Sequence, residues 1–335
     1  MDLGLCGVDQ YGGKPGCGCC DRCPVIRRAV SARGRRVEGA GMVNPVGQPA
    51  IAADATPEDL VRRVLAETPV FRDLPRLIAY MISLPHRALR PDEVWVKDFG
   101  DFAFIVEPGR FFLHGDHRGE IHGVPFGPRA RLIFAYFIQE AVSSPSLQVD
   151  RGGMSASQWF ESLGLSIGGK TYTMVREQEM RVSAARFITT FRAYGYEGIA
   201  WDPLYISGMR GDPGLGRTVA QQHRNMVQLS QHLFNELAEH PSRIPFSALA
   251  ALSNQSLGLD IYYWLAYRLP VLDEPVSLEW GELFRCFGTS YKQMRHFEPR
   301  FIEKLEMVLD TYKEAKVGIE PGGIVLYPSP PPQAG

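Results

Sequence analysis

The stretch that decides the fold is residues 155–186, SASQWFESLGLSIGGKTYTMVREQEMRVSAAR. Ser155 can cap a first helix, and residues 164–169 form a glycine-containing turn. A second helix follows over residues 170–186. Two helices joined by a short turn are the pattern of a helix-turn-helix, whose second helix can enter the major groove of DNA.

The flanking residues extend this pattern, and the same order of elements recurs near the C-terminus. Around the first helix-turn-helix we predict a buried helix at 127–143, a short strand at 147–149 and a strand pair at 187–196 and 198–206. The second set comprises helices at 256–268, 279–287 and 290–312, a strand at 276–278, and a hairpin at 315–318 and 323–327. Helix, strand, helix, turn, helix and hairpin is the order of a winged helix. We predict an α+β fold with tandem winged-helix domains.

A chain of 335 residues is long enough for two or three domains. Residues 1–55 are rich in cysteine, arginine and glycine and are expected to be a flexible N-terminal segment. Residues 56–225 form the first predicted winged-helix domain, with a capped helix at its start and additional β structure. Residues 226–328 form the second, and residues 329–335 a disordered tail.

Composition permits DNA binding without requiring it. The net charge is -1, but residues 121–225 carry 11 basic and 8 acidic groups, whereas residues 226–335 carry 9 and 13. A DNA-binding surface needs a local excess of positive charge, not a positive total. No run approaches the ~20 apolar residues of a membrane helix, and the N-terminus lacks the layout of a signal peptide. We therefore expect no membrane association and a cytoplasmic location.

The start of the helix at 170–186 carries the first candidate DNA-binding side chains. In helix-turn-helix docking, this end of the second helix faces the bases. Arginine can read guanine with two hydrogen bonds, while lysine and threonine can hold phosphates. An ordinary solvated helix face would show a similar composition. The candidates are Lys170, Thr171, Tyr172, Thr173 and Arg176.

In the second unit, apolar residues spaced for burial separate a core stripe from the candidate DNA-binding residues. The stripe is Met294, Phe297, Phe301, Leu305 and Val308. The candidates beside it are Ser290, Tyr291, Lys292, Arg295, His296 and Arg300. Pro299 disfavours a regular helix at this point, which makes Arg295 a better candidate than Arg300.

The N-terminal cysteines could bind a metal. Cys17, Cys19, Cys20 and Cys23 supply enough thiolates for one tetrahedral zinc, although their spacing matches no standard zinc finger. A disordered, redox-sensitive tail is the alternative. No other cofactor is expected.

Several stretches resemble plasmid-encoded RepA-type replication initiators. They include GVPFGPRARLIFAYFIQEAV at 123–142, the helix-turn-helix stretch, and LGLDIYYWLAYRLP at 257–270, and the resemblance extends over about residues 60–330. It implies a bacterial protein whose tandem winged helices bind repeated double-stranded origin sequences (iterons). It also implies opening of the origin, recruitment of the host helicase and replication proteins, repression of the protein's own gene, and an equilibrium between monomer and dimer.

Two other functions are compatible with parts of the sequence. A transcriptional repressor could use the same two modules without initiating replication. Residues 164–171 also fit the pattern of a P-loop, which would make the protein an ATPase. A P-loop follows a buried strand, however, and here the preceding residues predict a helix. We find no set of catalytic side chains and expect no enzymatic activity.

Overall fold

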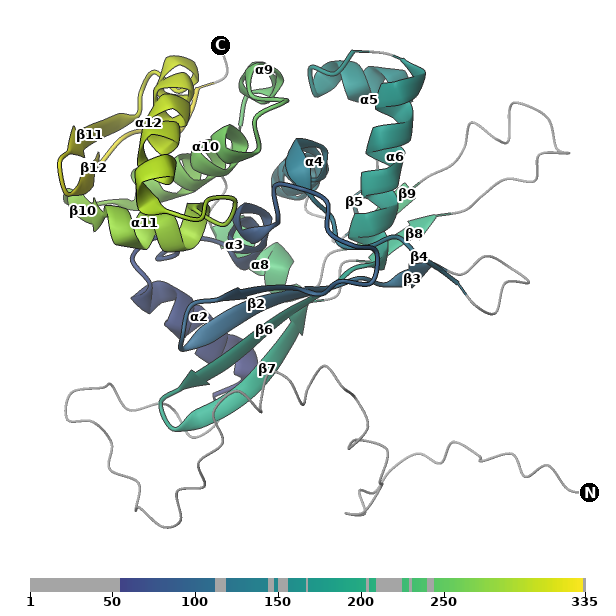
Figure 1. The fold of residues 1–335 in the computed structure, drawn as a ribbon, viewed down its shortest axis with the longest axis horizontal. Coiled ribbons are helices and arrows are strands. Elements are labelled where there is room, and N and C mark those ends of the chain that lie inside the picture. The colour runs from purple at the N-terminus through teal and green to yellow at the C-terminus, as the bar shows by residue number, and fades with distance from the viewer. Residues whose placement is uncertain are drawn as a thin grey trace, which may run out of the picture. The chain divides into compact units, whose positions relative to one another are not determined.

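The computed structural model describes residues 55–111, 119–143, 148–149, 156–166, 168–202, 205–208, 225–228, 231–239 and 244–333. The four cysteines of the predicted metal site lie outside these residues. Helices and small antiparallel sheets make up the described chain, in agreement with the predicted α+β class (Figure 1). None of its helices is long and apolar enough to cross a bilayer.

Most of the described helices agree with the predicted ones, whereas α3, α8 and α9 were not predicted. The helices are α2 (Pro57–Glu67), α3 (Arg76–Ser83), α4 (Gly127–Ser143), α5 (Ala156–Ser162), α6 (Gly169–Ala184), α8 (Gln231–Glu239), α9 (Phe246–Ala251), α10 (Ser256–Arg268), α11 (Trp280–Phe287) and α12 (Met294–Thr311), with a 3-10 turn η4 (Leu269–Val271). The start of α2 follows from its sequence, because Thr56 and Asp59 form a reciprocal capping box.

The last long helix begins later than predicted. It starts at Met294 and not at Ser290, and extended Gln293 precedes it. The amide of Tyr291 donates to the carbonyl of Gly288 at 2.9 Å, so these residues close a turn after α11. Ser290, Tyr291 and Lys292 therefore belong to the connection between α11 and α12.

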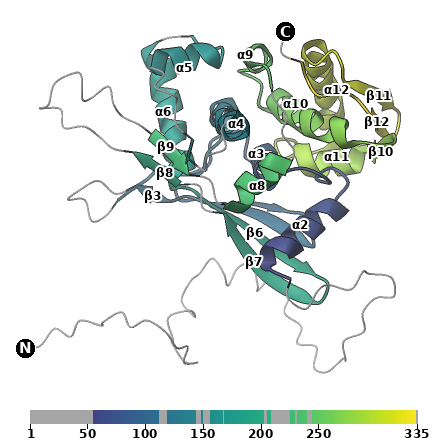
Figure 2. The ribbon, with the colours of Figure 1, turned by 180° about the vertical axis from the view of Figure 1, so that it is seen from behind.

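The strands form four antiparallel sheets (Figures 1 and 2). They are β1 (Trp95–Asp98), β2 (Phe102–Glu107), β3 (Arg110–Phe111), β4 (Glu120–Ile121), β5 (Gln148–Val149), β6 (Arg186–Ala193), β7 (Tyr196–Asp202), β8 (Tyr205–Gly208), β9 (Asn225–Gln228), β10 (Val276–Glu279), β11 (Lys316–Glu320) and β12 (Gly323–Tyr327). The sheet orders are β1-β2-β6-β7, β3-β4, β5-β9-β8 and β10-β12-β11.

Two of these sheets share one topology. In the sheet β10-β12-β11, the strand before a helix pair joins the hairpin after it, and Val276 lies opposite Leu326. The sheet β5-β9-β8 repeats that arrangement around α5 and α6, with Val149 opposite Val227. In both cases a hairpin follows the helix pair in the chain, and its second strand pairs with the strand that precedes the helix pair.

The hairpin that directly follows α6, which was predicted to complete the first unit, belongs to a different sheet. Strands β6 and β7 pair with each other as expected, but they extend the sheet of β1 and β2. The reason is their buried side: Phe187 and Phe191 continue the apolar inner side formed by Phe102 and Phe104. The strands β8 and β9, farther along the chain, pair with β5 instead.

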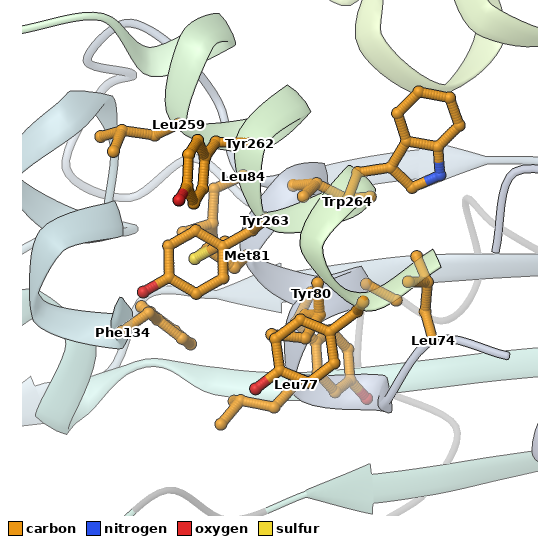
Figure 3. Packing of buried hydrophobic residues seen from close by; sticks show 14 of the residues in the cluster. Leu74, Leu77, Tyr80, Met81, Leu84, Phe134, Leu259, Tyr262, Tyr263 and Trp264 are labelled. Carbon is orange, nitrogen blue, oxygen red and sulfur yellow. The ribbon is translucent and has the colours of Figure 1, made fainter. Parts of the chain in front are cut away.

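One continuous core joins the elements of both units. Helix α10 packs on α3, α4 and α12. Figure 3 shows Met81 of α3, Phe134 of α4, and Tyr263 and Trp264 of α10 in this core. The indole nitrogen of Trp264 donates to the carbonyl of Val70 at 2.9 Å, so its polar atom is satisfied inside the core.

A buried ion pair fixes α4 against α10. Arg131 and Asp260 are fully buried, and two guanidinium nitrogens of Arg131 donate to the two carboxylate oxygens of Asp260 at 2.5 and 3.0 Å. Arg131 also donates to the carbonyl of Leu84 at 2.8 Å. The ring of His86 lies 2.9 Å from the same carboxylate, and burial lowers its pKa. Charges without solvent need such partners, because an unpaired buried charge is very costly.

Further buried contacts join the first sheet to the C-terminal helices. Lys97 of β1 is buried, and its ammonium donates to the carbonyl of Cys286 at the end of α11. Burial lowers the pKa of Lys97 to about 8 and raises that of the Cys286 thiol to about 12. Elsewhere in the core, Arg76 of α3 pairs with Glu236 of α8 at 3.1 Å.

Candidate nucleic-acid interface

Helix α6 is held mainly through its C-terminal half, while at its start Tyr172 contacts Phe160 of α5 with ring centroids 5.9 Å apart. Its buried residues are Val175, Gln178 and Val182. The amide of Phe126 donates to Gln178 at 2.9 Å, and Arg181 donates to the carbonyl of Val124 at 3.1 Å. These contacts hold the helix to the segment that leads into α4.

The first candidate residues lie on the half of α6 that projects from these contacts. Lys170, Tyr172, Thr173 and Arg176 are exposed, and Thr171 is half-buried. The hydroxyl of Thr173 already donates to the carbonyl of Gly169 at 2.9 Å. Within the described residues, Lys170 and Arg176 form no ion pair. Their charges are therefore available to a partner.

Helix α12 has a different setting. It is buried along one side, with Phe297, Phe301, Leu305 and Val308 in the core, as predicted. Met294, the remaining member of the stripe, is partly buried. The stripe seats the helix on α10 and α11 and leaves its opposite side to solvent. The exposed candidates are Arg295, His296 and Arg300 within the helix, and Ser290 and Lys292 just before it. Tyr291 is half-buried.

The basic side chains of the second unit are not equally available. Arg300 donates to Glu303 at 2.6 Å, and Lys304 donates to the same carboxylate at 2.7 Å. Lys292 and Arg295 form no ion pair within the described part of the chain. The prediction that Arg295 is a better candidate than Arg300 thus gains a second reason, although the structure tests neither as a DNA contact.

The starts of α6 and α12 share two properties. Neither helix has a side-chain cap, and neither has an acidic residue in its first turn. By contrast, Glu279 and Glu282 close the start of α11 with a capping box. Helices α3 and α10 also lack side-chain caps, but their first turns are largely buried. Free backbone N–H groups and the positive end of the helix dipole suit phosphate oxygens.

Helix α4 and helix α10 separate the two candidate helices. Contacts run from α6 to α4, from α4 to α10 and from α10 to α12, and Figures 1 and 2 show the four helices in this sequence. The buried pair Arg131–Asp260 is at the centre of this series. The series is therefore a packed frame that carries a candidate helix at each end.

The structure adds a residue that the sequence pattern did not single out. Arg87 is exposed on the segment after α3. Burial raises the pKa of Tyr291, while the positive charges of Arg300 and Arg87 oppose that rise, so Arg87 lies near the start of α12. Arg87 and Tyr291 are far apart in the sequence, and no local pattern predicts that they lie close together.

Alternative sites receive little support from the geometry. Helix α5, and not a strand, precedes the glycines of the P-loop pattern at 164–171. Within the described residues, no three His, Cys, Asp or Glu side chains are grouped as metal ligands. The cysteine cluster at residues 17–23 falls outside those residues, and its proposed zinc stays a prediction.

Comparisons with known proteins find a similarity over the middle part of the chain. Residues 124–280 match a family model described as plasmid encoded RepA protein. No curated protein matches the chain. A crystal structure of RctB domains 2-3 is similar with a TM-score of 0.45 and 11% identity, covering 74% of this chain and 94% of that chain. A selenomethionine structure of RctB domains 2 and 3 gives 0.48 and 12%, with 76% and 98% covered. Residues 124–280, just under half of the chain, are thus similar to the family of plasmid-encoded RepA proteins.

Proposed function

We propose that this protein starts plasmid replication by binding repeated origin DNA through two winged-helix units, without catalysis of its own. The observation that carries the proposal is the matching order of β5-β9-β8 and β10-β12-β11. In a winged helix, such a hairpin is the wing and the second helix of the pair reads the major groove. Helices α6 and α12 hold that place in the two units.

The projecting start of α6 supports a reading role in the first unit. Arg176 lies on the same exposed half as Lys170, and three-residue steps along a helix keep side chains close to one another. We propose that Arg176 contacts bases and that Lys170 and Thr171 contact phosphates. Tyr172 and Thr173 would contact the groove beside them.

The second unit would contribute a smaller basic patch. Arg295 is the proposed base contact, with Lys292 and His296 beside it and Ser290 and Tyr291 at the turn. Arg87 would add a phosphate contact from the first part of the chain. Arg300 would contribute less, because Glu303 already neutralises it.

Binding to repeats near the gene is the direct test. We expect the full chain to prefer duplexes that contain those repeats over scrambled duplexes at physiological salt, measured by fluorescence anisotropy. Neutralising each phosphate should add about -0.9 to the slope of log affinity against log salt. Arg176→Ala should weaken this binding, and Arg62→Ala is the control, because Arg62 is also an exposed arginine but lies on α2 and pairs with Glu239. Equal affinity for repeats and scrambled DNA would disprove sequence-specific binding.

A plasmid assay separates an initiator from a repressor. We expect a minimal plasmid that carries this gene and its neighbouring repeats to replicate, through opening of the origin and recruitment of host helicase and replication proteins. Repression of the gene's own promoter should accompany replication. Repression without replication would assign the protein to the alternative class of winged-helix repressors.

A further inference from the structure

The sheet β1-β2-β6-β7 has one buried side and one exposed apolar side. On the inner side, Phe104 and Phe187 pack against Tyr80 of α3, with ring centroids 5.0 and 5.5 Å away. Alternate residues on the strands point to the opposite side. We call that side the outer face, and its residues are Val96, Asp98, Ala103, Ile105, Glu107, Arg186, Ile188, Thr190, Arg192, Glu197, Ile199 and Trp201.

The apolar residues of the outer face cross all four strands. Val96 of β1 lies opposite Ile105, Ile105 opposite Ile188, and Ile188 opposite Trp201 of β7. The next row contains Asp98, Ala103, Thr190 and Ile199, so it has a carboxylate at its β1 end. Val96, Ile199 and Trp201 are 51%, 61% and 50% exposed. A contiguous exposed apolar patch of this kind marks an interaction site, whereas isolated exposed apolar residues do not.

Charged residues border the apolar rows. At one end, Arg186 of β6 pairs with Glu107 of β2 at 3.3 Å, and its guanidinium lies over the ring of Trp201 at 5.0 Å. At the other end, Arg192 of β6 pairs with Glu197 of β7 at 3.2 Å. Both ends therefore carry both signs of charge. An apolar centre with a polar rim is the usual composition of a protein interface.

We propose that the outer face binds the outer face of a second copy of this chain. A twofold axis parallel to the strands, between β2 and β6, would place β2 of one copy over β6 of the other. The strand axes of the two sheets would then be aligned, and each β2 would run antiparallel to the β6 that it covers. Each row would face itself in reverse order, so that Val96 meets the second copy's Trp201 and Ile105 meets the second copy's Ile188.

The charge pattern favours a second copy over an unrelated partner. Glu107 and Arg186 are register partners on β2 and β6, the two strands that flank this axis. The axis therefore sets each Glu107 opposite the other copy's Arg186, and both crossed pairs form at once. A single surface thus provides its own complement, which a symmetric pair requires. The resemblance to RepA-type initiators implies an equilibrium between monomer and dimer; this inference rests on it and names the surface that pairs.

The oligomeric state of the full chain without DNA tests the inference. We expect sedimentation velocity to show a monomer–dimer equilibrium, and Ile199→Asp to weaken dimerisation by at least about 30-fold. Ile319→Asp is the control, because Ile319 is 45% exposed but lies on β11. Circular dichroism and urea unfolding check that each variant folds. Dimers unaffected by Ile199→Asp in a folded variant, or a wild-type chain that stays monomeric, would overturn the proposal.

A charge exchange tests the axis itself. Glu107→Arg places arginine opposite arginine in a dimer, and Arg186→Glu places glutamate opposite glutamate, so we expect either variant alone to dimerise more weakly. Mixed in equal amounts, the two variants should form heterodimers, because both crossed pairs again join opposite charges. No recovery on mixing would overturn the proposed arrangement. DNA affinity measured on the same variants separates this result from failure of the proposed function, since neither residue is a proposed DNA contact.

Discussion

Helices α6 and α12 occupy equivalent positions in two units of the same topology, yet they are held differently. Helix α12 is buried along its length through Phe297, Phe301, Leu305 and Val308. Helix α6 is held mainly in its C-terminal half, and an additional hairpin separates it from β8 and β9. The strand order β5-β9-β8 is thus kept even though β6 and β7, which belong to another sheet, lie between α6 and β8 in the chain.

The largest effect is expected where the two units join. Asp260→Ala leaves Arg131 buried without its carboxylate partner, and removal of one member of a buried ion pair costs about 3–5 kcal/mol. Urea unfolding, followed by tryptophan fluorescence, should show this loss in a single transition, because α4 and α10 share the pair. Asp310→Ala is the control, since its pair with Lys313 is exposed. Two separate transitions would mean that the units unfold independently.

The next effect compares the two helices proposed to read DNA, α6 and α12. If Arg176 and Arg295 contact bases, alanine at either should cost about 1–3 kcal/mol in DNA binding and relax preference at particular positions. If they contact only phosphate, the loss should be uniform across sequences and the salt slope should fall by about one unit. Footprinting should show two protected major grooves about 10.5 bp apart. A single protected groove unaffected by Arg295→Ala would exclude α12 as a DNA reader.

A smaller effect concerns the pH dependence of the contact between β1 and α11. The pKa of Lys97 falls from 10.5 to about 8 on folding, so the unfolded chain binds more protons between these values. Stability should therefore rise with pH, by about 1 kcal/mol between pH 7 and pH 9. Lys97→Met should lose this rise relative to the wild type, measured by urea unfolding, whereas Lys313→Met at an exposed site should keep it. An unchanged pH profile in Lys97→Met would contradict the assignment.

The smallest effect separates two arginines of α12. Because Glu303 already accepts a hydrogen bond from Arg300, we expect Arg300→Ala to reduce DNA affinity less than Arg295→Ala does. The same anisotropy titration measures both variants. A larger loss for Arg300→Ala would reverse their proposed roles.

Local patterns predicted the helices well because their determinants are close in sequence. The capping box of Thr56 and Asp59 lies within four residues, and the stripe of α12 repeats at helical spacing. Residues far apart in the chain were beyond such reasoning. The pairing of Arg131 with Asp260, and of Lys97 with the end of α11, depends on how apolar helices pack. The hairpin of β6 and β7 was predicted as a pair, but nothing local states which sheet it joins.

The candidate DNA contacts were predicted as residue types on particular helices, and the structure refines their settings. It places Arg176 and Arg295 on exposed helix surfaces and pairs Arg300 with Glu303. The turn before α12 was missed because Pro299 and the apolar stripe fix the body of the helix but not its first residue. Arg87 could not be proposed from sequence, because its position near Tyr291 arises only from folding.

The junction between α6 and β6 would make the two proposed binding events, DNA binding and pairing of two copies, dependent on each other. Only Ala185 separates Ala184, the last residue of α6, from Arg186, the first of β6. A Cβ atom at Gly109 would lie 1.6 Å from the carbonyl oxygen of Ala184, so the backbones meet there without room for adjustment. A shift of the sheet would therefore move the reading helix. If pairing of two copies changes affinity for DNA by some factor, thermodynamic reciprocity requires DNA to change the pairing affinity by the same factor.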